Sequence, residues 1–447
     1  MAATGLSTGG RLATREPIPW LNLALRGVCA LYLAVIVTAV LTYKTVFIEV
    51  VVDDPWFGVY SVVVCAFIMS RFLFSLFYRP APDPPGEPLE PTVAVVMPAF
   101  NEEAAVAASI RSLLAVDYPL EKLEIVVVND GSTDHTLQEI ESAAAGSQIV
   151  GVISFPENRG KRAAMAAGIR ATSAEIVAFV DSDSSLERDA LRRIVRGYVD
   201  PKVGAIAGHA EVENSRESWI ARMQAVRYFV AFRVCKAAES IFGAVTCCSG
   251  CFSTYRREAI APVLERWEHQ RFLGRPATYG DDRSLTNFVL RTWDVRYDEL
   301  ARSRTIVPTT FRVFLRQQLR WKRSWTRESL IVGRFIWRRS PLASVWAYLG
   351  IALPLVAPLV AVRAIAWQPF VAGAGAPFVY LIGIYAMALV YGLYYGLRHG
   401  RYDTLWVFGV LFVFFYLAFL LWQTWYAILT SRNSSWGTRT APAEVAR

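Results

Sequence analysis

The chain has 447 residues, a formal net charge of +9 and 54% hydrophobic residues. A soluble protein of this length would form two or three domains. Here, however, the apolar residues gather at the two ends of the chain, which excludes an entirely soluble protein. The basic charge does not indicate a nucleic-acid partner, because the arginines cluster beside the apolar segments, where lipid headgroups and membrane topology explain them better.

Two N-terminal segments, residues 28–47 and 59–78, are each long enough to cross about 30 Å of hydrocarbon as a helix. No small-residue cleavage site follows the first, so we do not expect a removable signal peptide. The stretch between them, "EVVVDDPW", is acidic and basic residues flank the pair, which predicts a cytoplasmic N-terminus and a cytoplasmic middle domain. Arg71 lies inside the second segment and is expected to face a bundle interior or a polar channel. Residues 1–80 are therefore predicted to form a membrane region with two transmembrane helices.

A second membrane region is predicted over residues 341–430. It contains three apolar segments, at 344–362, 377–397 and 405–429. Three crossings would place residues 431–447 outside the cell, whereas Arg432 and Arg439 favour the inside. We therefore expect 405–429 to be re-entrant or interfacial and the tail to be cytoplasmic. The sequence thus predicts a multi-pass protein of the plasma membrane.

Between these regions lies a domain with alternating strand and helix patterns. The Pro-rich linker "RPAPDPPGEPLEP" marks its start, with the boundary placed at residues 81–91. Four Val- and Ile-rich runs, "TVAVVMP", "EIVVVND", "QIVGVISF" and "EIVAFVD", are typical of strands buried on both faces. Helical patterns separate them, at "NEEAAVAASIRSLLA", "STDHTLQEIESAAA" and "RGKRAAMAAGIRATS". Residues 92–308 are therefore predicted to form an α/β domain with an open, mostly parallel sheet.

Polar clusters follow three of these strands, in "PAFNEE", "NDGSTD" and "DSDSS". Because such sheets bind ligands beyond the carboxyl ends of their strands, we expect the clusters to meet at one crevice. The chain lacks the glycine fingerprints of dinucleotide-binding and P-loop proteins, so those classes lose their main support.

Asp181 and Asp183 end the fourth strand one residue apart. A helix N-cap accounts for one of these acids but not for both. Two carboxylates in a crevice suit Mg²⁺ or Mn²⁺ shared with substrate phosphates, and we favour this interpretation. Asp130 is either a turn residue before Gly131 or an acceptor for a nucleobase or ribose.

Lys161 and Arg162 open a helix, where cations oppose the helix dipole, so an anionic partner such as a nucleotide is favoured over a solvated helix start.

Asp281 and Asp282 in "TYGDDRSLTN" also begin a helix. An N-cap again explains one of the two, and a carboxylate there could instead accept the proton of an attacking hydroxyl.

The segment "FLRQQLRWKRSW" is basic, aromatic and amphipathic, within a region predicted at residues 309–340. It is expected to lie partly on anionic lipid. Gln317, Arg320 and Trp321 fall on one helix face, where they could grip a phosphate and stack on a sugar or base.

The six cysteines do not form a disulfide framework, and zinc at "CCSGC" is disfavoured because no second pair follows at finger spacing.

The ordered motifs "PAFNE", "NDGSTD", "NRGKRAAM", "DSDS", "SGCFSTYR", "GDDRSLTN", "QQLRW" and "SSWGTR" resemble those of the processive family-2 glycosyltransferases, which have the GT-A fold. The similarity runs from about Thr92 to Arg439 and is greatest to the hyaluronan synthases. Chitin and chitooligosaccharide synthases share much of the motif set. One departure is Cys251, which stands where the family usually has proline.

The resemblance implies a role for each motif residue. The catalytic carboxylates would be Asp282 and Asp281. The residues that bind Mg²⁺ or Mn²⁺ would be Asp183 and Asp181. The implied substrate-binding residues are Pro98, Asn101, Glu102, Asp130, Lys161, Arg162, Asp181, Ser249, Gly250, Gln317, Arg320, Trp321, Trp436 and Arg439. The last two would belong to a loop over residues 431–447 that closes on the nucleotide.

The implied reaction is the inverting, processive transfer of sugars from UDP-N-acetylglucosamine and UDP-glucuronate to a hyaluronan-like β-linked polysaccharide, which the protein exports through its own channel. Trp346, Trp422 and Trp425 could line that path or belong to interfacial aromatic belts. A chitin-like synthase that uses UDP-N-acetylglucosamine alone is the alternative enzyme. A membrane protein that only senses nucleotide is the non-enzymatic alternative. The expected partners are UDP-sugars, UDP, the nascent polysaccharide and the bilayer, with no obligate protein partner.

Overall fold

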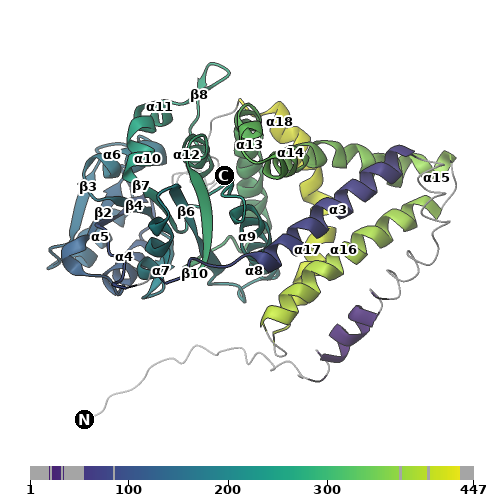
Figure 1. Cartoon of the computed structure of the whole chain (residues 1–447), viewed down its shortest axis with the longest axis horizontal. Helices are drawn as coiled ribbons and strands as arrows, with labels where there is room; N and C mark the ends of the chain where they lie inside the picture. Colours follow the sequence, from purple (N-terminus) through teal and green to yellow (C-terminus); the bar gives the residue numbers. More distant parts are fainter. Residues whose placement is uncertain are drawn as a thin grey trace, which may run out of the picture.

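The structure is a computed structural model that describes residues 20, 23–31, 34, 55–83, 86–371, 375–399 and 403–432. An α/β domain lies beside a group of long helices (Figure 1). The predicted span at residues 28–47 lies mainly outside the described residues.

The α/β domain contains an eight-stranded mixed sheet in the order β3-β2-β1-β4-β7-β6-β10-β5. The strands are β1 (Val93–Ala99), β2 (Leu123–Asn129), β3 (Val150–Ser154), β4 (Ile176–Phe179), β5 (Ser184–Leu186), β6 (Val203–Val212), β7 (Ser253–Arg256) and β10 (Asp294–Thr305). The first four strands along the chain are parallel neighbours, as predicted. β7 runs antiparallel to both β4 and β6, and β5 runs antiparallel to β10. The predicted sheet is therefore confirmed, with β7 and β5 as antiparallel strands within it.

Helices cover this sheet and carry the motif residues. They are α4 (Val106–Leu114), α5 (Thr136–Ala144), α6 (Lys161–Arg170), α7 (Ala190–Val195), α8 (Trp219–Val230), α9 (Ala237–Ser240), α10 (Arg257–Ile260), α11 (Leu264–Glu268) and α12 (Asp281–Leu290). A π-helical turn, Ala231–Lys236, joins α8 to α9, and a small hairpin of β8 (Arg271–Phe272) and β9 (Arg275–Pro276) precedes α12. The predicted helix at "NEEAAVAASIRSLLA" begins only at Val106, because residues 101–105 form the turn after β1.

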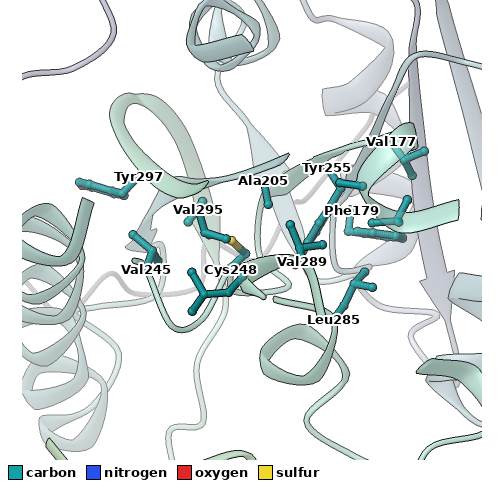
Figure 2. Packing of buried hydrophobic residues seen from close by; sticks show 14 of the residues in the cluster. Val177, Phe179, Ala205, Val245, Cys248, Tyr255, Leu285, Val289, Val295 and Tyr297 are labelled. Atoms are coloured by element: carbon teal, nitrogen blue, oxygen red, sulfur yellow. The ribbon is translucent and has the colours of Figure 1, made fainter. Parts of the chain in front are cut away.

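The position of α12 is fixed by the hydrophobic core. Leu285 and Val289 are four residues apart, so they lie on one helix face, and neither is exposed to solvent. They belong to the same buried cluster as Phe179 and Tyr255 of the sheet (Figure 2). The packing of α12 on β6 and β10 of the sheet therefore sets the place of the two aspartates at its first turn.

The helices beside the α/β domain include α3 (Pro55–Phe77), α13 (Phe311–Gly333), α14 (Pro341–Val362), the short α15 (Gln368–Val371), α16 (Gly375–His399), α17 (Trp406–Phe415) and α18 (Leu421–Leu429). Four helical stretches in the described residues are long and apolar enough to cross a membrane: Gly58–Phe77, Pro341–Val371, Tyr380–His399 and Trp406–Leu429. The last consists of α17, a π-helical turn at Tyr416–Leu420 and α18 without interruption. The segment predicted to be re-entrant or interfacial is therefore one continuous helix of spanning length.

Candidate functional site

The loops that follow β1 and β2 are joined by hydrogen bonds. Asn101 has a φ of +52°. Its backbone N–H donates to Ser132 Oγ at 3.1 Å, and the Thr133 N–H donates to Asn101 Oδ1 at 2.9 Å. The Glu102 N–H donates to Thr136 Oγ1 at 2.7 Å. Two of the predicted polar clusters thus meet at one edge of the sheet, just beyond Pro98, which is buried in β1.

Asp130 connects the end of β2 to the start of α6. Its carboxylate accepts hydrogen bonds from the N–H groups of Arg159 at 2.7 Å and of Gly160 at 2.9 Å, and the residue is only 2% exposed. Gly160 has a φ of +94°, a conformation that favours glycine. This turn places the next residue, Lys161, at the edge of the sheet.

Asp181 lies at the centre of the site. Its carboxylate forms an ion pair with Lys161, and its N–H donates to the carbonyl of Gly250 at 3.0 Å. A Cβ on Gly250 would lie 2.8 Å from both carboxylate oxygens of Asp181. The glycine therefore gives the carboxylate space that a larger residue would fill.

Asp183 lies close to the same neighbours as Asp181. Burial, followed by the charges of both aspartates, raises the pKa of the Cys251 thiol to about 12. The residues after Asp183 form β5 and the next helix begins only at Ala190, so neither aspartate caps a helix. The capping interpretation of the two acids is wrong, and two carboxylates that approach one buried thiol form a candidate cation site.

Asp282 lies in the first turn of α12 without capping it. The N-cap is Gly280, with a φ of +76° and no side-chain cap. Asp282 Oδ1 accepts from the Arg283 N–H at 2.7 Å, and Cys247 Sγ lies 3.6 Å from Oδ2. Burial and the Asp282 charge raise the pKa of Cys247 to about 11.

Asp281 has a different environment. Arg162 Nε donates to Asp281 Oδ1 at 2.8 Å, and the two side chains are 6% and 3% exposed. Arg162 also donates to the carbonyl of Trp267 at 3.0 Å and to Gln270 Oε1 at 3.1 Å. These contacts make Arg162 and Asp281 a buried link between α6 and α12.

The predicted acceptor residues lie on α13 and on the segment before β7. Gln317 Oε1 is 3.5 Å from Gln318 Nε2, and Arg227 of α8 lies 5.4 Å from the ring centroid of Trp321. Arg320 lies one helical turn from Gln317 on the same helix. Ser249 Oγ accepts from Lys236 Nζ at 3.2 Å.

Several residues in the site were not predicted from sequence. Lys236 donates to the Cys247 carbonyl at 2.7 Å as well as to Ser249, and Gln270 contacts Arg162. The one available signal for Lys236 is its position between apolar neighbours in "VCKAA". Trp436 and Arg439 lie outside the described residues.

All six cysteines are free, and the only described group of three adjacent metal-ligand side chains is Glu265, Glu268 and His269, which contains no cysteine.

Comparisons with known proteins agree with this geometry. The family model of glycosyl transferase family 2 matches residues 94–264. A hyaluronan synthase of Streptococcus pyogenes is 31% identical over 389 residues, which cover 86% of this chain and 90% of the relative. An N-acetylglucosaminyltransferase of Azorhizobium caulinodans is 37% identical over 250 residues, covering 55% and 63% of the two chains. A solved mannosyltransferase from Pyrobaculum calidifontis, in complex with GDP-Man and Mn²⁺, covers 80% of this chain and 99% of its own, with a TM-score of 0.55 and 22% identity.

The chain belongs to the family-2 glycosyltransferases and has the GT-A fold, as predicted. It is therefore an enzyme rather than a protein that only senses nucleotide. Within that family it is a homologue of the hyaluronan synthases over most of its length.

Proposed function

We propose that this enzyme polymerises sugars from UDP-N-acetylglucosamine and UDP-glucuronate into a hyaluronan-like β-linked polysaccharide. The observation that carries the proposal is the extent of the similarity to hyaluronan synthase, which includes the membrane-helix region as well as the catalytic domain. The shorter match to N-acetylglucosaminyltransferases favours a second candidate, a chitin-like synthase that uses UDP-N-acetylglucosamine alone.

The donor nucleotide would bind at the edge of the sheet where β1, β2 and β4 end. Asp130 and the turn at Asn101 and Glu102, next to Pro98, would hold the uridine. Asp181 and Asp183 suit a divalent cation because their carboxylates offer oxygen ligands. Asp181 already attracts one cationic group, the ammonium of Lys161, and the lack of a side chain at Gly250 leaves the Asp181 carboxylate accessible. When bound, Mg²⁺ or Mn²⁺ would offset negative charge on the departing diphosphate.

Asp282 would act as the general base. It would take the proton of the acceptor hydroxyl while the hydroxyl oxygen bonds to the anomeric carbon from the face opposite the diphosphate. The bond from that carbon to the diphosphate breaks in the same displacement, so the configuration inverts and UDP leaves. Asp281 and Arg162, predicted as catalytic and substrate-binding residues, would instead position α12, since their charged groups are buried against each other.

The acceptor sugar would bind between α13 and the segment before β7. Trp321 would stack on it, Gln317 with Ser249 and Gly250 would surround it, and Arg320 would face the diphosphate. Trp436 and Arg439 would belong to the loop that closes over the nucleotide. The catalytic domain would face the cytoplasm of a plasma-membrane protein, and the polymer would leave through a channel formed by the chain itself.

Purified full-length protein in lipid nanodiscs would test the proposal when it is given each donor alone and then both together. Polymer that forms only with both donors supports the hyaluronan-like product. Polymer from UDP-N-acetylglucosamine alone would establish the chitin-like alternative and reject the first proposal. Released UDP, measured in parallel, reports turnover in every case.

A further inference from the structure

Helix α13, which carries the proposed acceptor residues, lies alongside α18, the end of the helix of membrane-spanning length at Trp406–Leu429 (Figure 1). Side-chain hydrogen bonds join the two helices. Gln423 Nε2 donates to the carbonyl of Leu315 at 3.3 Å, and Arg323 Nε donates to Thr430 Oγ1 at 3.0 Å. The place of α13 is therefore set by the membrane region as well as by the catalytic domain.

Lys322 joins the two helices directly beside the proposed acceptor tryptophan. It follows Trp321 in α13 and is half-buried. Its ammonium donates to Thr424 Oγ1 at 2.9 Å and to the carbonyl of Leu420, and it lies 5.2 Å from the ring centroid of Tyr416. Two of the three N–H donors of the ammonium are thus used on the membrane-spanning helix.

These contacts fall on an irregular part of that helix. Leu420 is the last residue of the π-helical turn Tyr416–Leu420, which joins α17 to α18. Such turns are rare, and they occur frequently at functional sites. Because the regular helical repeat changes there, the Leu420 carbonyl and the Thr424 hydroxyl form a pair of hydrogen-bond acceptors at one point along the helix. Lys322 therefore anchors α13 at a fixed position rather than along a uniform surface.

Arg227 of α8 holds Trp321 from the catalytic domain. Its guanidinium carbon lies 5.4 Å from the ring centroid of Trp321 and 5.6 Å from that of Phe412 in α17, distances at which a cation attracts an aromatic face. Its Nη1 donates to Gln318 Oε1 at 2.7 Å. A shift of α13 along α18 would break the contacts of Lys322 and would also carry Trp321 away from Arg227.

We propose that Lys322 is a positioning residue for acceptor binding, because its bonds to Leu420 and Thr424 hold α13 where Trp321 stacks on the acceptor sugar. Lys322 acts through Trp321 and not on the substrate itself. The acceptor binds only those molecules in which α13 is in this place, so loss of the contacts raises the apparent dissociation constant in proportion. The inference rests on the proposed acceptor role of Trp321, and it makes acceptor affinity depend on a contact with the membrane region.

Removal of the ammonium is the direct test. Lys322→Met keeps an unbranched apolar side chain, and Arg316→Met, which removes an exposed cation of the same helix, is the matched control. Full-length protein in lipid nanodiscs would be assayed with one donor at a time and a short oligosaccharide of hyaluronan or chitin as acceptor, so that a single sugar is added. We expect Lys322→Met to raise the acceptor KM about tenfold, as for the loss of hydrogen bonds from a charged donor. The kcat and the donor KM should stay within about twofold of those of Arg316→Met, because the donor site is untouched.

A second variant removes the other partner of the bond and covers the case in which Lys322→Met fails to fold. Thr424→Val keeps the shape of the side chain but lacks the hydroxyl, so it should raise the acceptor KM about threefold, the equivalent of one hydrogen bond. The double variant should have the KM of Lys322→Met, since residues that act through one contact are not additive.

Trp321→Ala separates failure of the inference from failure of the proposed function. A raised acceptor KM in Trp321→Ala, with an unchanged KM in both Lys322→Met and Thr424→Val, would overturn the inference. A donor KM that rises in parallel with the acceptor KM would also overturn it, because it would indicate a general loss of structure. An unchanged acceptor KM in Trp321→Ala, or no transfer by the unaltered enzyme, would reject the proposed acceptor site instead.

Discussion

Arg162 Nε donates to Asp281 Oδ1 over 2.8 Å, and neither side chain is more than 6% exposed. This ion pair joins the first residues of α6 to the first turn of α12. It continues through Gln270, whose Oε1 accepts from Arg162 and from Ser284 Oγ, to Glu328 of α13 at 3.2 Å from Gln270 Nε2. The helices that carry Lys161, Asp282 and Trp321 are thus held together by one buried polar network.

Removal of one partner of this pair should destabilise the enzyme. Asp281→Ala leaves the Arg162 charge buried without its carboxylate, which typically costs about 3–5 kcal/mol. The double variant Arg162→Met with Asp281→Leu removes both charges and should lose much less. Chemical unfolding of the purified protein in detergent, followed by tryptophan fluorescence, measures both effects. A double variant as unstable as the single one would contradict the assignment of a positioning role to this pair.

Asp282→Asn should slow turnover by orders of magnitude without loss of stability. The amide keeps the size of the carboxylate and can still accept from the Arg283 N–H, but it cannot accept the proton of the acceptor. A general base typically contributes about 10²–10⁴-fold to the rate. We expect a fall of that size in UDP release, with unchanged affinity for UDP by calorimetry. Asp189→Asn, at the N-terminus of α7, is the control and should keep full activity. Near-normal polymer yield from Asp282→Asn would reject the assigned base.

The arrangement of the site along the sheet could be predicted because it follows from the alternation of strands and helices. Strands β1, β2 and β4 are parallel, so the polar residues that follow them meet at the same edge. The ion pair of Arg162 with Asp281 joins residues 119 positions apart and depends on how α6 and α12 pack. Both residues were predicted within the site, but their pairing was not, since no local pattern encodes it. Gln270 lies in a loop outside any motif and was missed for the same reason.

Asp183→Ala should remove the metal dependence of nucleotide binding. If Asp181 and Asp183 share a divalent cation, the variant keeps only the Asp181 carboxylate, which also pairs with Lys161. That one carboxylate would hold the cation too weakly for the cation to bridge to the diphosphate. UDP affinity measured by calorimetry with Mn²⁺, with Mg²⁺ and with chelator present should depend on the metal in the unaltered enzyme and not in the variant. Equal UDP affinity in all three conditions for the unaltered enzyme would show that the two acids have another role.

Gly250→Ala should weaken donor binding through crowding alone. The added Cβ would lie 2.8 Å from both oxygens of Asp181, closer than real Cβ atoms approach other groups, so the carboxylate has to move. Such overpacking typically costs about 1–3 kcal/mol, or about 5- to 150-fold in an equilibrium constant. Gly151→Ala is the matched control, because a Cβ there meets nothing within 4 Å. Unchanged UDP affinity in Gly250→Ala would place donor binding away from Asp181.

His209 should make stability depend on pH. The imidazole is 2% exposed, with Nδ1 2.7 Å from Tyr297 Oη and Nε2 3.6 Å from Glu211, and Arg233 and Arg302 are also close enough to influence it. Burial lowers the pKa of His209 from 6.5 to about 4. The unfolded chain therefore binds a proton that the folded protein excludes, so stability is complete above pH 6.5 and falls as the pH drops toward 4.

Between pH 7 and pH 5 this loss amounts to about 2 kcal/mol. His209→Gln stays neutral throughout and should remove most of that slope. Glu211 has a pKa lowered to about 2 by its interaction with His209 and titrates only below its ordinary value near 4.5, so it does not contribute in this window. Unfolding midpoints of the unaltered protein and of His209→Gln at pH 5, 6 and 7 measure the two slopes, and parallel slopes would mean that His209 is protonated in the folded enzyme.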